Sequence, residues 1–597
     1  MLSPDTRRLF TDFLSPPLGM VFSSGVAATY SLDILTLLAV PLQLALPVVG
    51  DSEITDGVAL LDLLRRVTGS LRVFCERGRM LVPRENHILY SMLEEVVIEV
   101  DPPLGGSFHP KVWLLRFVDP SGDLPDVFRL MVSSRNITSD NSWDAAVVLD
   151  GKPGSASSGS VVSSSSFSAA ASAPLTVFLR SLCGMAHVGV SSATASVVDS
   201  LASMVDSVEW ELPPGCFALF FHLLGPGHGG WMPPWSSSLV VVSPFLSEWA
   251  VKSLAATSAA PLAVVSRTSA FTSVACDRFG SQLVLHEAAE TDEGDDDLCA
   301  GEIGLHAKVY VYREWYNTHV VIGSANATTR ALKGVNVEFM VEVVGKDRFL
   351  GKPDSFVAGF EDMLVDFTDD DSELVSDSLA DEVLADVHVS LLGIPLSLKC
   401  VSADSGWQME LGFGGAVELP AGVSLSVWLV TMQESSAVAV DEIVLGGSVL
   451  LPCVAPESLT GFVAFSLKCG ADVLRFSLNI PVLGMPEERS GFILRSVIRR
   501  SEDFLRYLMM LLSGYESSYF AHGNSSAFAA FIRRSSSGDL RLLENIVAAL
   551  AADPAQLVAV DKLVLDLEEG ASSLDIFPDG FLEFWGVFRE MLESENL

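Results

Sequence analysis

One pattern occurs twice in this chain, and it constrains the fold more than any other feature of the sequence. Residues 108–138 read FHPKVWLLRFVDPSGDLPDVFRLMVSSRNIT, and residues 305–328 read LHAKVYVYREWYNTHVVIGSANAT. Each stretch has His, one residue and Lys, then two alternating apolar segments around a polar turn, then Ser, one residue and Asn. Alternation with period two around turn residues predicts a β-hairpin. A duplication of this kind, with its copies far apart, predicts two half-domains that build one composite site.

The residues repeated in the two copies carry phosphate chemistry. They are His109, Lys111, Ser134 and Asn136 in the first copy, and His306, Lys308, Ser324 and Asn326 in the second. Side chains two apart on a strand share a face, so each His lies beside its Lys, and the returning strand delivers Ser and Asn next to them. Lys supplies a positive charge, and Ser and Asn supply neutral donors, which together suit the oxygens of a phosphate.

Two such sets facing each other predict catalysis at one phosphodiester. A neutral imidazole can attack phosphorus, while a protonated imidazole can give its proton to the leaving oxygen. Taken singly, either copy has an ordinary explanation, because Ser-x-Asn after a strand is usually a helix N-cap. Agreement at four positions in both copies favours the functional interpretation.

The duplicated motif resembles that of the phospholipase D superfamily, whose members carry two His-x-Lys and Ser-x-Asn motifs. That family usually has an Asp five residues after the Lys, where this chain has Arg116 and Arg313. The loss of this Asp in both copies resembles the tyrosyl-DNA phosphodiesterase branch and related nuclease-like members. The resemblance implies a phospho-histidine intermediate and no metal or other cofactor. It also implies His109 as nucleophile, His306 as general acid, Lys111, Lys308, Asn136 and Asn326 as phosphate-binding residues, and Ser134 and Ser324 as supporting donors.

Two carboxylates near the motifs are further candidates. Glu338, in VNVEFMVEV, is predicted to orient a catalytic histidine, and Asp144, in NSWDAAVV, is its counterpart in the first half, counted with the substrate-binding residues. The alternative for both is an ordinary ion pair. His222 and His228 flank a Gly/Pro loop, which is weak evidence for a metal, and no ligand set in the sequence requires one.

Charge and hydrophobic patterning restrict the partners. The chain has 37 basic and 75 acidic residues, a formal charge of −38, which argues against unspecific coating of DNA but permits a local positive site. The arginines between residues 65 and 84 either extend from structural elements or contact phosphate or nucleic acid. The most apolar run, residues 34–49, is short and contains Pro41 and Pro47. It predicts a buried helix that breaks at the prolines, no membrane association and, with no secretory signal, a cytoplasmic protein.

The order of predicted elements indicates an α/β fold. Strand, helix and strand alternate in both halves, predicting mixed sheets with flanking helices. A Ser/Gly/Ala-rich loop is expected over residues 151–174, a Pro/Gly-rich separator over 213–235, and a solvated acidic loop over 291–297. Short alternating runs over 387–480, beginning with VHVSLLG, predict a β-sandwich, and helical periodicity follows. The expected units are two phospholipase D-like half-domains (20–225 and 226–380), the sandwich (385–482) and a helical domain (485–597).

The leading functional hypothesis is a nuclease acting on DNA, with a bacterial defence effector as its setting and a protein partner such as a helicase on the C-terminal domains. Two alternatives stay open at this point. One is a phospholipase or phosphatidyl transferase, which shares the family chemistry. The other is a non-catalytic scaffold of the same fold in a protein complex.

Overall fold

The computed structural model describes most of the chain. The described ranges are 10–45, 57–139, 142–154, 167–168, 172–274, 279–285, 304–360, 363–368, 379–403, 406–501, 503–505, 507–508, 546, 554–568, 576–578 and 580–594. The predicted acidic loop, Pro47 and most of the predicted Ser/Gly/Ala-rich loop lie outside these ranges.

The first half forms an eight-stranded mixed sheet in the order β5-β3-β1-β6-β7-β8-β10-β9. The strands β1, β3 and β5 run parallel, and the remaining neighbours pair antiparallel. The predicted hairpin is β6 and β7. The bounds are β1 Val21–Thr29, β3 Leu71–Glu76, β5 Val97–Val100, β6 Val112–Val118, β7 Val127–Ser133, β8 Ala146–Pro153, β9 Phe167–Ser168 and β10 Val208–Glu211.

The second half repeats this arrangement in another eight-stranded sheet, ordered β11-β17-β16-β15-β12-β13-β14-β18. Its series β13, β12, β15, β16, β17 has the same order and directions as β3, β1, β6, β7, β8. The mixed α/β class is therefore confirmed. The bounds are β11 Cys216–Leu224, β12 Leu239–Val242, β13 Leu262–Val265, β14 Phe279–Leu285, β15 Val309–Glu314, β16 Asn317–Gly323, β17 Glu338–Lys346 and β18 Leu364–Asp366.

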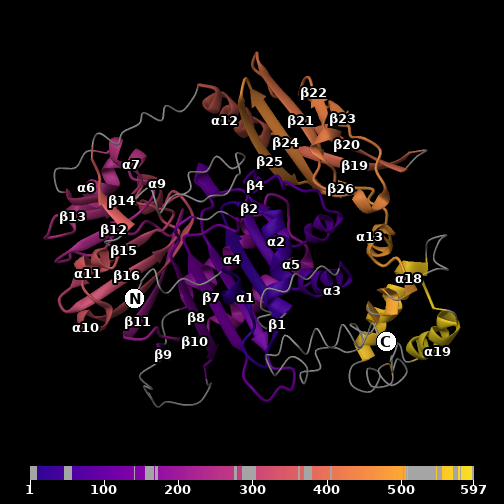
Figure 1. Ribbon diagram of the computed structural model, residues 1–597, viewed down its shortest axis with the longest axis horizontal. Coiled ribbons are helices and arrows are strands. Elements are labelled where there is room, and N and C mark those ends of the chain that lie inside the picture. The colour runs from indigo at the N-terminus through magenta and orange to yellow at the C-terminus, as the bar shows by residue number, and fades with distance from the viewer. Residues whose placement is uncertain are drawn as a thin grey trace.

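The two sheets share one apolar core, which fixes the halves against each other. Figure 1 shows the two halves next to each other. Helices α4 (Ala173–Met185) and α5 (Ser192–Val205) contribute to this core, and the ring centroids of Phe178 on α4 and Phe339 on β17 lie 5.2 Å apart. The core joins buried residues of both hairpins, such as Leu114 and Val311. Burial of apolar surface at this interface stabilises the relative position of the two His-x-Lys segments.

Helices cover the other faces of both sheets. Helices α6 (Glu248–Ala256), α7 (Thr268–Thr272) and α9 (Thr329–Leu332) share an apolar cluster with the second sheet. Helices α1 (Phe10–Leu14), α2 (Ile34–Ala45) and α3 (Gly57–Thr68) do so with the first. The short helices α10 (Asp347–Leu350) and α11 (Pro353–Ala358) follow β17.

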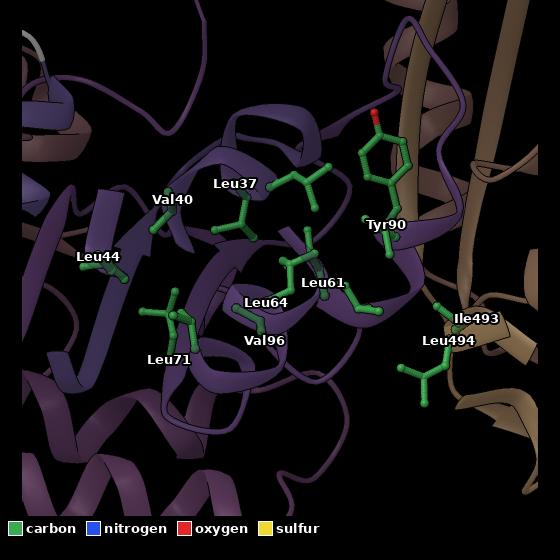
Figure 2. Packing of buried hydrophobic residues seen from close by; sticks show 14 of the residues in the cluster. Leu37, Val40, Leu44, Leu61, Leu64, Leu71, Tyr90, Val96, Ile493 and Leu494 are labelled. Atoms are coloured by element: carbon green, nitrogen blue, oxygen red, sulfur yellow. The ribbon is translucent and has the colours of Figure 1, made fainter. Parts of the chain in front are cut away.

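The predicted break at Pro41 is wrong, because α2 continues through this residue to Ala45. Proline inside a helix costs about 3 kcal/mol through a lost hydrogen bond and a steric clash. Figure 2 shows Leu37, Val40 and Leu44 of α2 within the apolar cluster that also holds Leu61 of α3. Full burial of several such side chains, at about 1.5–3 kcal/mol each, outweighs the cost of the proline.

Three further expectations differ from the structure. The Pro/Gly-rich passage is not only a separator, because it contains β11. Residues 151–153 extend β8, where Gly151 pairs with Trp210. The run beginning at Val387 lies in helix α12 (Leu379–Leu392), whose residues Leu384, Val387, His388 and Leu391 are buried. Their spacing of three, four and seven is that of one helix face, and it overrides the local alternation.

The sandwich consists of a four-stranded sheet, β23-β20-β19-β26, and a six-stranded sheet, β2-β4-β25-β24-β21-β22, around a separate core. Two of its strands, β2 and β4, come from the N-terminal half of the chain. The domain boundaries expected from the sequence stay predictions. The bounds are β2 Leu32–Asp33, β4 Met80–Leu81, β19 Leu396–Ala403, β20 Gly406–Phe413, β21 Val423–Leu429, β22 Val438–Val440, β23 Ser448–Leu450, β24 Phe462–Cys469, β25 Asp472–Asn479 and β26 Val482–Leu483.

Helices α13 (Arg489–Val497), α18 (Pro554–Glu568) and α19 (Phe581–Ser594) follow the sandwich. Figure 2 shows Ile493 and Leu494 of α13 in the cluster that contains Leu61 of α3. Arg489 also donates hydrogen bonds of 2.9 Å to both carboxylate oxygens of Glu94. Among the described residues, no helix combines the length and the apolar character that a membrane crossing needs.

Candidate active site

The two His-x-Lys segments lie in extended backbone just before the hairpins, and each pairs with the opposite half of the molecule. The backbone N–H of His109 donates to the carbonyl of Val337 (2.9 Å), which precedes Glu338. The backbone N–H of His306 donates to the carbonyl of Trp143 (2.8 Å), which precedes Asp144. The halves therefore interlock at the duplicated motif, and the two copies form one site.

Each histidine is hydrogen-bonded to a carboxylate from the opposite half, so the two halves exchange carboxylates. Nδ1 of His109 lies 2.9 Å from Oε2 of Glu338, in the second half, and Nδ1 of His306 lies 3.0 Å from Oδ1 of Asp144, in the first. An ionised carboxylate only accepts hydrogen bonds, so each Nδ1 is the donor and each Nε2 carries the lone pair. Burial raises the pKa of Glu338, but His109, Lys111 and the hydrogen bonds lower it more, so its pKa lies below the ordinary value. Both carboxylates thus set the tautomer of an imidazole.

The two serines hold these carboxylates. The hydroxyl of Ser134 donates to Oδ1 of Asp144 (2.7 Å), and the hydroxyl of Ser324 donates to Oε2 of Glu338. The hydroxyl oxygen of each serine also accepts a hydrogen bond from the backbone N–H of the residue after the carboxylate, which is Ala145 (2.9 Å) for Ser134 and Phe339 (3.0 Å) for Ser324. Both serines are fully buried. This placement differs from the expectation of direct phosphate donors, because both hydroxyl protons are already engaged with a carboxylate.

The two lysines are buried and converge. Nζ of Lys111 donates to the carbonyl of His109 (3.0 Å), and Nζ of Lys308 donates to the carbonyl of His306 (2.6 Å). They are 2% and 1% exposed. Burial, and then the charge of Lys308, hold the pKa of Lys111 well below its ordinary value. Two buried ammonium groups that repel each other form a binding site for an anion, whose charge would remove both penalties.

The pKa values of both imidazoles are lowered. Burial lowers the pKa of His109 to about 4, against the opposing effect of Glu338. Burial also lowers the pKa of His306, and Lys308 lowers it further while Asp144 opposes them. Their side chains are 14% and 17% exposed. Near neutral pH both rings are therefore neutral without a ligand, and a bound phosphate would favour protonation of an imidazole beside it.

The two asparagines show the same unsatisfied atom. Oδ1 of Asn136 and Oδ1 of Asn326 are buried without a hydrogen-bond partner in the described part of the chain. An amide can present its oxygen or its nitrogen by rotation, so these groups are available to a ligand. A buried polar group left unsatisfied at the same place in both halves marks the position of a ligand.

Two further residues, which no sequence pattern singled out, support the site from behind. The backbone N–H groups that follow the asparagines, of Ile137 and Ala327, donate to the hydroxyls of Thr29 (3.2 Å) and Ser243 (2.9 Å). Thr29 is the last residue of β1, and Ser243 directly follows β12. The only signal in the sequence was a hydroxyl residue at the end of an apolar strand, which is too common to single them out.

One matched position carries residues of opposite charge in the two halves. The register places Val26 beside Arg72 and Val240 beside Ala263, which makes Glu76 the equivalent of Arg267. Oε2 of Glu76 accepts the backbone N–H of Phe108 (2.6 Å), the residue before His109. Nε of Arg267 donates to the carbonyl of Leu305 (3.0 Å), the residue before His306. Opposite charges thus perform the same structural task in the two halves.

Several predicted arginine contacts are internal. Arg116 pairs with Asp126 (2.7 Å) within the first hairpin, and Arg313 pairs with Asp347 (2.7 Å) on α10, so both arginines have carboxylate partners inside the protein. In the N-terminal basic stretch, Arg72 is 1% exposed and donates to Thr194 (2.9 Å). Arg72 is therefore structural, although it lies buried instead of extending to solvent.

His222 pairs with Glu342 (2.7 Å). Glu342 also accepts from His319 (2.6 Å) and the hydroxyl of Tyr312 (2.6 Å). Burial raises the pKa of Glu342, but these hydrogen bonds lower it to about 2. Within the described ranges, no three His, Cys, Asp or Glu side chains are arranged to hold a metal ion.

Comparison with known proteins adds little to this geometry. No family model matches the chain, and no curated protein matches it. Among solved structures, the chain shows a likeness to the polyphosphate kinase of Porphyromonas gingivalis, with 12% sequence identity and a TM-score of 0.28. The match covers 64% of this chain and 50% of the kinase, so this chain spans about half the length of that protein. A likeness this slight carries no argument about activity.

Proposed function

We propose that this chain is a metal-independent phosphodiesterase of the phospholipase D type that works through a phospho-histidine intermediate. The observation that carries the proposal is the exchange of Glu338 and Asp144 between the halves. It supports a single site made of two imidazoles with matched tautomers, two buried lysines and two asparagines whose side-chain oxygens have no partner. That set matches a phosphodiester in charge and in donors.

The reaction divides into two steps with balanced proton transfers. Nε2 of neutral His109 attacks phosphorus, and the bond to the leaving oxygen breaks as His306 gives that oxygen its proton. His306, now neutral, takes a proton from water, whose oxygen attacks phosphorus and releases His109. The assignment of His109 as nucleophile rests on the resemblance of the duplicated motif, and a pKa that burial lowers to about 4 agrees with it, because the ring stays neutral.

The other site residues bind the phosphate or orient the two imidazoles. Lys111, Lys308, Asn136 and Asn326 bind the non-bridging oxygens. Glu338 and Asp144 orient the imidazoles and stabilise their protonated forms, and Ser134 and Ser324 fix those carboxylates. Asp144 is accordingly a positioning residue here, and the two serines act through the carboxylates instead of through phosphate.

We further propose DNA as the substrate, which makes the chain a nuclease. Support comes from the absence of the family Asp, replaced by Arg116 and Arg313 in their ion pairs. A role in bacterial defence, with a helicase-like partner on the sandwich and the C-terminal helices, extends this proposal. The long-range repulsion of a chain with charge −38 means that the substrate is recognised locally or delivered by such a partner.

The test is hydrolysis in EDTA. Single- and double-stranded DNA and phosphatidylcholine vesicles are incubated with the full chain, and the products are followed. DNA cleavage that His109→Ala abolishes supports the proposal. His187→Ala is the matched control, since His187 forms another His–carboxylate pair, with Asp101 (2.6 Å), on the surface. Choline or phosphatidic acid release without DNA cleavage would establish the lipid alternative, and no hydrolysis of any diester would favour the scaffold.

A further inference from the structure

Each half of the molecule places an aromatic ring and a guanidinium together beside the site. In the first half, Cζ of Arg79 lies 5.2 Å from the ring centroid of Tyr30. In the second half, Cζ of Arg267 lies 5.3 Å from the ring centroid of Phe245. Neither pair belongs to the duplicated sequence motif.

The two pairs lie at the same end of equivalent strands, although Phe245 corresponds in register to Ser31 and Arg267 to Glu76. Tyr30 follows β1, and Phe245 follows β12, the equivalent strand. The hydroxyl of Thr29 donates to the carbonyl of Ser31, and the hydroxyl of Ser243 donates to the carbonyl of Phe245, both at 2.8 Å. These same hydroxyls receive the backbone N–H groups that follow Asn136 and Asn326. Each aromatic residue therefore lies in the short segment anchored beside a phosphate-binding asparagine.

Both pairs are also tied to the reacting histidines. The rings of Tyr30 and His109 have centroids 5.1 Å apart, and Nζ of Lys111 lies 5.7 Å from the Tyr30 ring. Arg267 holds the carbonyl of Leu305, the residue before His306. Phe245 is 50% exposed, so part of its apolar ring faces solvent.

We propose that these two pairs are stacking subsites that hold unpaired nucleobases on either side of the bound phosphodiester. The inference rests on the proposed function and names its substrate class as single-stranded nucleic acid. Aromatic faces stack on any base, and a neighbouring guanidinium both stacks and attracts the backbone phosphates. A guanidinium beside each ring also repels a cationic headgroup such as choline, which favours a nucleic acid over a phosphatidylcholine.

The experiment separates stacking from charge by comparing two ligands. A labelled oligodeoxythymidine and an abasic strand of the same length and charge are titrated in EDTA, with binding followed by fluorescence anisotropy. The full chain carries His109→Ala to prevent cleavage, and this change lies in the half opposite to Phe245. Phe245→Ala is then compared with Phe245→Trp, which keeps a stacking surface.

Phe349 provides the matched control. It is another exposed phenylalanine (60%) with a guanidinium on its ring, Arg348 at 4.6 Å. It lies on α10, after the end of β17 that is opposite to Glu338. Phe349→Ala should therefore leave binding of both strands unchanged.

The expected result is a loss of oligodeoxythymidine affinity by about 5- to 150-fold in Phe245→Ala, since stacking is worth ~1–3 kcal/mol per base. The abasic strand should change less than about twofold, and Phe245→Trp should restore thymidine binding. Equal losses on both strands, or equal binding of both strands by the chain without the Phe245 substitution, would overturn the proposal.

Hydrolysis of bis(p-nitrophenyl) phosphate tests the proposed function separately. Hydrolysis that depends on His109, combined with equal losses on both strands, would retain the phosphodiesterase and reject the subsites. Base-dependent binding without hydrolysis of any diester would retain the subsites and reject the catalytic function.

Discussion

The two halves of the site make the same hydrogen bonds with different surroundings. In both, a carboxylate from the opposite half holds Nδ1 of the imidazole, a serine holds the carboxylate, and the lysine donates to the carbonyl of the histidine. The supporting residues differ, with Glu76 and Tyr30 behind His109 and Arg267 and Phe245 behind His306. A duplicated set of hydrogen bonds can therefore give two histidines different roles when the residues around each histidine differ.

The largest expected effect is the difference between the two histidine variants. With bis(p-nitrophenyl) phosphate, whose leaving group needs no proton, His306→Ala should release one burst of p-nitrophenolate and stop as phospho-His109. His109→Ala should show no burst. Steady-state turnover should fall by at least about 10²–10⁴-fold in both. Rapid-quench kinetics measure the burst, and a burst in His109→Ala alone would reverse the assignment of nucleophile and acid.

The exchanged carboxylates come next. Glu338→Gln and Asp144→Asn should each lower kcat by about 10²–10⁴-fold with little change in KM, because a neutral amide no longer fixes the tautomer. Ser134→Ala and Ser324→Ala remove only the hydroxyl that holds each carboxylate, so their losses should be smaller. Steady-state kinetics with circular dichroism as a folding control decide this. A change confined to KM would show that the carboxylates contact substrate instead.

The pH dependence of activity distinguishes the roles of the two histidines. The pKa of His109 is about 4 and that of His306 lies below its ordinary value. The value of kcat/KM should rise as the pH increases through about 4, because His109 loses its proton. It should then decrease again, with a midpoint at a pH below about 6.5, because His306 loses its proton. Glu338 raises the pKa of His109, so Glu338→Gln should move the acidic limb to lower pH. Asp144→Asn should move the basic limb to lower pH for the same reason. Constant activity up to pH 9 would contradict the assigned roles.

The smallest expected effect tests the charge difference behind the histidines. The pKa of Glu76 is raised to about 7 mainly by burial, and its carboxylate favours the charged form of Lys111. Glu76→Gln should weaken inhibition by inorganic phosphate by less than about tenfold, with the loss growing as pH rises. Arg267→Gln should not reproduce that pH dependence. Inhibition constants measured from pH 6 to 9 test it, and identical profiles for both variants would show that the difference has no electrostatic effect.

The sequence allowed the prediction of the hairpins, the α/β class and the sandwich, because these follow from local alternation and from the comparison of two copies. His109, Lys111 and their partners were identifiable for the same reason. The exchange of Glu338 and Asp144 between halves was not predictable, since the pairing of distant strands leaves no local pattern. The matched positions of Glu76 and Arg267 were hidden too, because their side chains differ in type and charge. Only the strand register shows that they correspond.

Two errors have a similar origin. Pro41 argued locally for a break in α2, but the buried face of the helix outweighs the proline. The run at Val387 alternates over a few residues, while burial of Leu384 and Leu391 reveals the helical face. In both places tertiary packing decides between local tendencies of similar strength.

The exchange of carboxylates also bears on how such a chain can be divided or arise. A single half would own an imidazole and a lysine but would lack the acid that fixes its tautomer, so it would be chemically incomplete alone. Two identical copies related by a two-fold axis would complete each other, since such a contact is self-complementary. The single chain holds the two copies as such a dimer would, and joining them permits the two histidines to diverge into a nucleophile and a general acid.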